Sequence, residues 1–136
     1  MNYGAHSLDR IFYATGLRVE EVHGVTSNPV SDHDIEVDAQ LLLKLTGGVS
    51  AVVTFCGNHV PDEYETSYYF TDGAVKIKGA NLWVYENGQY VDYGNDHCIL
   101  LEKQLEELVK WLRGEENELV TPEYGRDVIK VLEQVV

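Results

Sequence analysis

Hydrophobic and polar residues alternate along the middle of the chain. Between residues 35 and 45 the odd-numbered positions are apolar and most even-numbered positions are polar, and the pattern returns over residues 49–55 after Gly47 and Gly48. A period of two is typical of β-strands, and the two glycines predict a hairpin turn between them. Because the connections are short, neighbouring strands are expected to be antiparallel. Further strands are predicted over residues 17–25, 64–70, 74–79, 82–88 and 89–93, and a loop over residues 26–34.

A helical period replaces this alternation at both ends of the chain. Apolar residues recur at helical spacing between Ala5 and Thr15, and Gly16 is a C-cap candidate, while the opposite stripe carries Asn2, His6, Asp9 and Tyr13. Residues 98–114 and 123–136 predict two closing helices, the first with a leucine stripe and the second with Thr121 and Pro122 at its start. A helix, a run of strands and a run of helices predict an α+β fold.

One face of the predicted sheet is apolar where water would favour polar residues. Partial cover by a helix or loop would explain this pattern, and so would contact with another subunit. We favour a subunit contact, because the helices are expected to cover the other face. The positions concerned are Leu42, Val52, Tyr69, Trp83 and Tyr85.

Composition narrows the class of protein. A chain of 136 residues can bury its own core, which predicts a single domain over residues 1–136. Ten basic against 23 acidic residues make a net charge of −13 that disfavours nucleic-acid partners. Cys56 and Cys98 are too few for a disulfide framework or a zinc pattern, and neither a signal segment nor a membrane span is found. We expect a soluble cytoplasmic protein with reduced thiols.

Candidate chemistry is confined to few residues. The sequence has no dinucleotide-binding, Walker or nucleophile-elbow motif, and residues 31–34, "SDHD", are expected to form a solvated loop rather than a metal site. His6 lies in the first helical turn, where the helix dipole favours a neutral imidazole suited to exchanging a proton. Asn2 and Asp9 can lie on the same helix face. From residue types alone, a surface or capping histidine stays the favoured alternative.

The segment "NYGAHSLDRIFYATG" (residues 2–16) resembles the (D/N)-x-G-x-H-x-x-D segment of the glucose–fructose oxidoreductase/inositol dehydrogenase (Gfo/Idh/MocA) family. Residues 34–55, residues 68–79 and the closing helices are similar to further segments of its C-terminal domain, in the same order. The resemblance implies an open, mainly antiparallel sheet with helices on one face. It also implies that the chain lacks the family's N-terminal Rossmann domain, which binds NAD or NADP and carries a Glu-Lys-Pro motif.

The resemblance implies roles for two residues. His6 matches the catalytic acid/base or substrate ligand, and Asn2 matches a substrate-binding position that is Asp in other members. An asparagine can orient the ring or bind substrate but cannot relay a proton.

Taken as a whole, the resemblance predicts part of an NAD(P)-dependent oxidoreductase acting on a small sugar, polyol or related hydroxy compound. This part is expected to be inactive alone and to bind neither cofactor nor metal, with NAD or NADP required by the full two-domain enzyme. It would form a dimer or tetramer through its outer sheet face. A stand-alone, non-catalytic dimerising domain derived from the same family is the alternative. An unrelated α+β domain is a third interpretation, which a closed barrel or a parallel sheet would favour.

Overall fold

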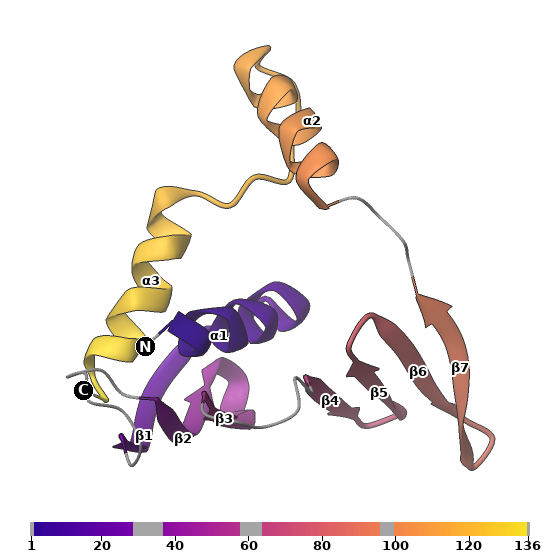
Figure 1. Ribbon diagram of the computed structural model, residues 1–136. Helices are drawn as coiled ribbons and strands as arrows, with labels where there is room; N and C mark the ends of the chain where they lie inside the picture. Colours follow the sequence, from indigo (N-terminus) through magenta and orange to yellow (C-terminus); the bar gives the residue numbers. More distant parts are fainter. Residues whose placement is uncertain (1, 29–36, 58–63, 96–99, 136) are drawn as a thin grey trace. The chain divides into compact units, whose positions relative to one another are not determined.

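The computed structural model describes residues 2–28, 37–57, 64–95 and 100–135 (Figure 1). The predicted α+β order is confirmed, and each described element falls on a predicted segment. The loop predicted over residues 26–34 was wrong at its start, because Thr26 and Ser27 pair with Ala39 and Asp38 in a strand; residues 29–36 lie outside the described part, as do Cys98 and the histidines His59 and His97. The elements are α1 (Asn2–Thr15), β1 (Val19–Ser27), β2 (Asp38–Leu45), the 3₁₀ turn η1 (Thr46–Gly48), β3 (Ser50–Cys56), β4 (Glu65–Phe70), β5 (Gly73–Lys78), β6 (Asn81–Glu86), β7 (Gln89–Asn95), α2 (Leu100–Leu112) and α3 (Pro122–Glu133).

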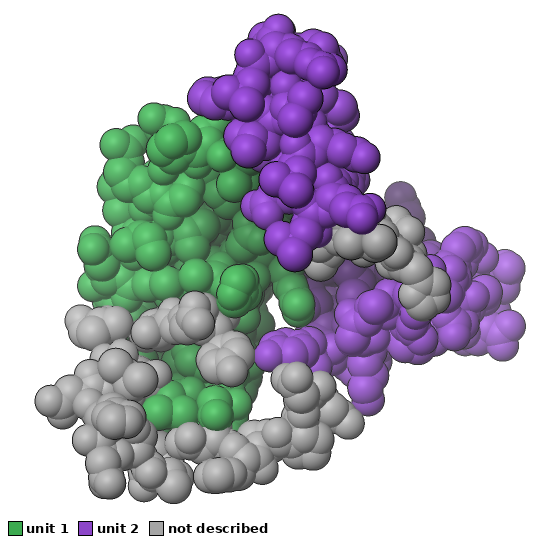
Figure 2. All heavy atoms as spheres, turned by 45° about the horizontal axis from the view of Figure 1, so that its top comes forward, with its two compact units in different colours: residues 1–60, 120–136 green, residues 61–119 purple. Residues whose placement is uncertain are grey.

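The described strands form two antiparallel sheets, ordered β1-β2-β3 and β4-β5-β6-β7. Neither a closed barrel nor a parallel pair occurs among these strands, so the third interpretation finds no support. The chain divides into two compact units, residues 1–60 with 120–136 and residues 61–119 (Figure 2). The single domain expected over residues 1–136 stays a prediction.

The core of the first unit lies between the β1–β3 sheet and helices α1 and α3. Alternate residues of β2 are buried, and Leu41, Leu43 and Leu45 are each 1% exposed. They pack in one apolar cluster with residues of α1, β3 and α3. The helices therefore cover one face of this sheet, as expected. The helical members of the cluster are Leu8, Ile11, Phe12, Val128, Val131 and Leu132.

The predicted turn and cap residues act as expected. Gly47 and Gly48 have φ angles of 76° and 78° in the turn between β2 and β3, a conformation that costs glycine little. At the start of α3, the Thr121 hydroxyl accepts a hydrogen bond from the amide of Tyr124 at 3.3 Å, and Pro122 occupies the first turn.

The β4–β7 sheet carries an aromatic row across its strands. The register places Tyr69 beside Ala74 and Tyr85 beside Tyr90, whose rings meet edge to face at 5.3 Å. Lys76 lies over the Tyr90 ring at 5.4 Å. Tyr69 is 78% exposed, so this row is open to solvent in the described part of the chain.

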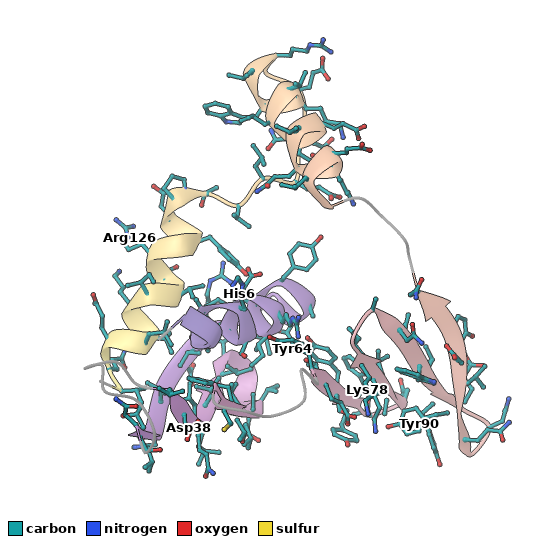
Figure 3. All side chains as sticks on the ribbon, viewed as in Figure 1. His6, Asp38, Tyr64, Lys78, Tyr90 and Arg126 are labelled. Atoms are coloured by element: carbon teal, nitrogen blue, oxygen red, sulfur yellow. The ribbon has the colours of Figure 1, made fainter. Side chains whose placement is uncertain are left out.

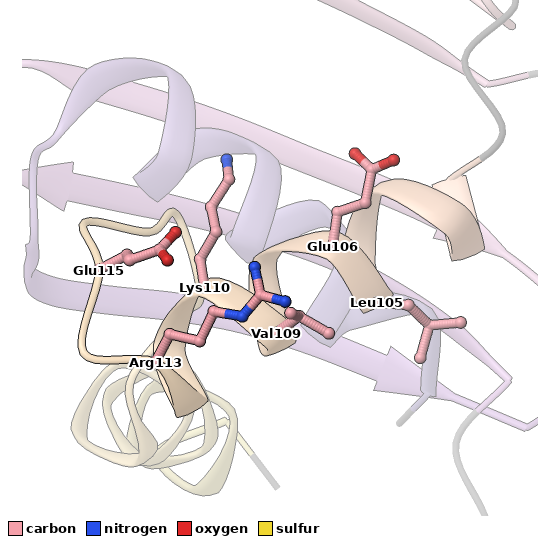
Figure 4. A pocket seen from close by; sticks show the side chains of 6 residues that line it. All are labelled: Leu105, Glu106, Val109, Lys110, Arg113 and Glu115. Carbon is pink, nitrogen blue, oxygen red and sulfur yellow. The ribbon is translucent and has the colours of Figure 1, made fainter.

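Helix α2 buries one polar residue, Glu107, and leaves its apolar face open. The Glu107 carboxylate accepts hydrogen bonds from the Lys110 ammonium and from the amide of Glu118, so the segment after the helix folds back against it. The leucine stripe predicted here is exposed instead, from 41% at Leu108 to 71% at Leu101. An open hollow of about 420 Å³ lies along this helix, lined by Leu105, Glu106, Val109, Lys110, Arg113 and Glu115 (Figure 4). None of the helices within the described ranges is long and apolar enough to cross a membrane.

Candidate functional site

Helix α1 carries the candidate site residues Asn2, His6 and Asp9. Its inner stripe packs into the core through Leu8 and Phe12, which leaves His6 exposed on the helix (Figure 3). The backbone of Asn2 begins α1, whereas its side chain lies outside the described residues. An exposed imidazole here can exchange a proton with a molecule that approaches from solvent or from another domain.

Asp9 shares the helix stripe of His6 and has a hydrogen-bond partner on α3. Its carboxylate Oδ1 accepts a hydrogen bond from the Tyr124 hydroxyl at 2.7 Å, and its main-chain oxygen lies 3.1 Å from the same hydroxyl. No hydrogen bond joins Asp9 to His6 within the part of the chain that the structure describes. The two residues share a helix stripe, but Asp9 connects α1 to α3.

Tyr124 lies in a small aromatic and cationic cluster. Its ring meets Phe12 edge to face, with 6.1 Å between ring centroids. The Arg18 guanidinium lies 5.5 Å from each of these two ring centroids, and its Nε is 4.0 Å from the carboxylate of Asp127 on α3. Burial and the hydrogen bond to Asp9 raise the pKa of Tyr124 to about 12, which keeps the phenol protonated as a donor.

An open hollow of about 260 Å³ borders this cluster, and its lining includes Arg18, Asp127, Lys130 and Gln134. His6 lines neither this hollow nor the one along α2. Among the described residues, no group of three or more His, Cys, Asp or Glu side chains is placed to hold a metal ion. In the remaining described histidine, His23, Nε2 donates a hydrogen bond to the carboxylate of the exposed Glu21 at 2.8 Å.

Tyr124 and Arg18 were not predicted as site residues from the sequence. Tyr124 is 115 positions from Asp9, and no local pattern connects the two. Arg18 follows the glycine that ends α1, where a basic residue is ordinarily taken as a surface charge. The only available signal was a tyrosine in the first turn of an amphipathic helix, which is compatible with many packing arrangements.

Comparison with known proteins gives a structural likeness and no sequence match. Neither a protein-family model nor a curated protein matches the sequence. Among solved structures, the chain is similar to UDP-N-acetylglucosamine 3-dehydrogenase from Acidithiobacillus ferrooxidans, with a TM-score of 0.85, 16% identity and coverage of 96% of this chain and 43% of that one. It is similar to aldose-aldose oxidoreductase from Caulobacter crescentus, solved with glycerol, with a TM-score of 0.83, 20% identity and coverage of 96% and 42%.

A third similar structure is the WlbA dehydrogenase from Bordetella pertussis in complex with NADH and UDP-GlcNAcA. Its TM-score is 0.67 and its identity is 14%, and the match covers 99% of this chain and 40% of that one. The chain thus spans less than half the length of these three proteins. At such identities the likeness is one of fold.

Proposed function

We propose that this chain, which has the fold of the C-terminal domain of Gfo/Idh/MocA-type oxidoreductases, is the substrate-side domain of an NAD(P)-dependent oxidoreductase. Its substrate would be a sugar, a polyol or a related hydroxy compound. The observation that carries the proposal is the match of nearly the whole chain to less than half of each oxidoreductase chain. The exposed His6 on α1, within a segment that resembles the family's histidine motif, supports it.

The dinucleotide expected for the full enzyme does not fit the residues of this chain. A dinucleotide turn needs glycines between a strand and the start of a helix. The described glycines with left-handed φ angles instead lie at hairpin turns, within β7 or after helices: Gly16, Gly47, Gly48, Gly79, Gly88, Gly94 and Gly114. We therefore assign cofactor binding to a Rossmann domain, and the hydride chemistry belongs to that cofactor.

Within this chain, His6 handles the proton. As the substrate hydroxyl is oxidised, the O–H bond breaks and its proton passes to the neutral imidazole, and in the reverse direction the imidazolium returns it to the carbonyl oxygen. Asn2 has no titratable group, so its amide can only hydrogen-bond the substrate or orient the ring. In this proposal His6 transfers the proton, and Asn2 orients the substrate or the imidazole ring.

The test is a two-domain protein in which a Rossmann domain precedes this chain, screened with sugars and polyols for nicotinamide reduction. On an active substrate, His6→Ala is expected to lower kcat by about 10²- to 10⁴-fold, the usual contribution of a general acid or base. His23→Ala is the matched control, because it removes another exposed histidine and should leave kcat unchanged. Full activity of His6→Ala would overturn the assignment.

The isolated 136-residue chain is expected to bind neither NAD nor NADP. Isothermal titration calorimetry checks this expectation directly. The control is the same titration of the two-domain protein, which should release or absorb heat on binding. Micromolar affinity of the isolated chain for NAD or NADP would contradict the assignment of cofactor binding to a separate Rossmann domain.

We also propose that the chain forms a homo-oligomer through its outer sheet faces. Leu42 and Val52 are 54% and 71% exposed on the β1–β3 sheet, and Tyr69 and Tyr85 are 78% and 44% exposed on the β4–β7 sheet. Apolar faces of this kind usually mark interaction surfaces. The unmodified chain should sediment as a dimer or larger, and charged substitutions at Tyr69 and Trp83 should shift it toward monomer. A monodisperse monomer at high concentration would count against the contact.

The same exposed faces support the second candidate function, a non-catalytic dimerising domain. The two candidates differ in one outcome. If the two-domain protein binds cofactor but reduces it with no sugar or polyol, while the chain still sediments as a dimer, the scaffold function is favoured.

A further inference from the structure

We infer that Tyr124 is a positioning residue for His6, acting through Asp9 to hold the first turns of α1 in one orientation. The inference rests on the proposed function of His6. It concerns a residue that touches neither the imidazole nor, in this proposal, the substrate.

The contact between Tyr124 and Asp9 is directional. A phenol has one proton, and the hydroxyl directs it to the carboxylate oxygen at 2.7 Å, with the main-chain oxygen of the same residue at 3.1 Å. Hydrogen bonds to an ionised acceptor are stronger than neutral ones. The bond therefore ties the side chain of Asp9 to α3, while the main-chain oxygen of Asp9 lies within hydrogen-bond distance of the same hydroxyl.

Tyr124 is itself held on several sides, so it can act as an anchor. Its amide donates to the Thr121 cap, and its ring lies edge to face against Phe12. The Arg18 guanidinium lies against both rings and approaches Asp127. These contacts come from α1, from α3 and from the segment after α1, and they limit the motion of the phenol.

The anchor lies one turn from His6. Asp9 follows His6 by three residues, a rise of about 4.5 Å along the helix axis. The core contacts of Leu8 and Phe12 hold the inner face of α1, but apolar packing is not directional and allows small rotations. The first turn also carries no acidic residue to stabilise the helix start. A directional bond at Asp9 therefore restricts the rotation and fraying that would displace the imidazole.

Tyr124→Phe removes the hydroxyl and keeps the ring. In the isolated chain, NMR hydrogen exchange should show about tenfold faster exchange for the amides of residues 5–9, the effect expected when a hydrogen bond to a charged group is lost. The matched control is Tyr93→Phe, which also removes a phenol–carboxylate hydrogen bond, the one to Glu86 on the β4–β7 sheet. That variant should leave exchange in α1 unchanged.

The two-domain protein then separates positioning from mere stability. Tyr124→Phe should lower kcat about tenfold without changing the KM for the nicotinamide cofactor, and Tyr93→Phe should leave kcat unchanged. If Tyr124 acts through His6, adding Tyr124→Phe to His6→Ala should cause no further loss. Asp9→Asn retains an acceptor oxygen and should recover part of the kcat that Asp9→Ala loses.

The outcomes distinguish this inference from the proposed function. If His6→Ala is inactive while Tyr124→Phe shows normal kcat and normal exchange in α1, positioning is refuted and the function of His6 stands. Positioning is also refuted if Tyr124→Phe lowers kcat by the same factor in the unmodified protein and in His6→Ala, because Tyr124 would then act independently of His6. If His6→Ala is fully active, the function of His6 fails and this inference fails with it.

Discussion

Gly24 in β1 provides the sharpest test of how the first unit packs. A methyl group at this position would point to the core face, 2.5 Å from Cγ1 of Val135, 2.7 Å from Cδ2 of Leu41 and 3.1 Å from the carbonyl oxygen of Gln40. Carbon atoms pack best at about 3.5–4.0 Å. Gly24 has no left-handed φ angle, so Gly24→Ala tests space and not backbone strain.

The size of the effect follows from which neighbours can move. Val135 is only partly buried and its side chain can shift, but Leu41 is 1% exposed within the core and the Gln40 oxygen belongs to the paired strand β2. Overpacking a core of this kind costs about 1–3 kcal/mol. Alanine recovers about 0.5–1 kcal/mol over glycine in a strand interior. The overpacking cost is the larger of these two terms. We therefore expect Gly24→Ala to lower the free energy of unfolding by about 1–2 kcal/mol.

Urea unfolding followed by circular dichroism measures this loss, which should lower the midpoint by about 0.5–1 M at a typical urea slope. Faster hydrogen exchange at the β2 amides would assign this loss of stability to the first unit. Gly73→Ala is the matched control, because the nearest atom to the added methyl is the Tyr85 carbonyl oxygen at 3.6 Å, an ordinary contact. Adding Val135→Ala to Gly24→Ala should restore part of the stability. The packing argument is refuted if Gly24→Ala is as stable as the unmodified chain, or if Gly73→Ala loses as much.

Three further predictions concern hydrogen bonds at Thr121, Glu107 and Tyr124. Thr121→Ala should lower the free energy of unfolding by about 1 kcal/mol through loss of the α3 cap, and Thr121→Ser should not; equal losses in urea would contradict the cap. Hydrogen bonds from Lys110 and from the Glu118 amide lower the pKa of Glu107. These two hydrogen bonds therefore stabilise the folded chain above the ordinary glutamate pKa of about 4.3. The stabilisation is lost as pH falls through the lowered pKa of Glu107. The Glu118 amide resonance should report that loss, and Glu107→Gln should abolish its pH dependence. The pKa of Tyr124 is raised to about 12. Its protonated phenol therefore stabilises the folded chain fully below the ordinary tyrosine pKa of about 10, and this stabilisation is lost as pH rises through about 12. Tyrosinate absorbance should show one late-titrating tyrosine that Tyr124→Phe removes.

Most of the secondary structure could be predicted, because its signals are local. The period of two in residues 38–45, the glycines at 47 and 48 and the Thr121 cap each act within a few residues of the chain. The helical period of α1 also predicted that His6 would lie opposite the buried stripe, and the structure exposes it. The catalytic role of His6 and the substrate-binding role of Asn2 stay predictions, since they depend on a substrate and a second domain.

The α2 helix shows the limit of a periodic pattern. Its leucines recur at helical spacing, which predicts an amphipathic helix but not the surface that it contacts. In the described residues the polar side receives the returning segment at Glu107, and the leucines stay exposed. Amphipathicity is set by the sequence of one helix, whereas its partner is decided by the rest of the fold.

By itself, the sequence determined the elements, their order and the helix that carries His6, because backbone hydrogen bonding and side-chain period are properties of neighbouring residues. Only the tertiary structure decided that Asp9 bonds to Tyr124, that Arg18 lies against two aromatic rings and that Gly24 leaves room for Val135. These contacts join residues far apart in the chain, and their distances depend on how the helices α1 and α3 pack on the β1–β3 sheet. Non-local packing of this kind leaves no periodic trace in the sequence, which is why the helix face of Asp9 could be predicted but its bond to Tyr124 on α3 could not.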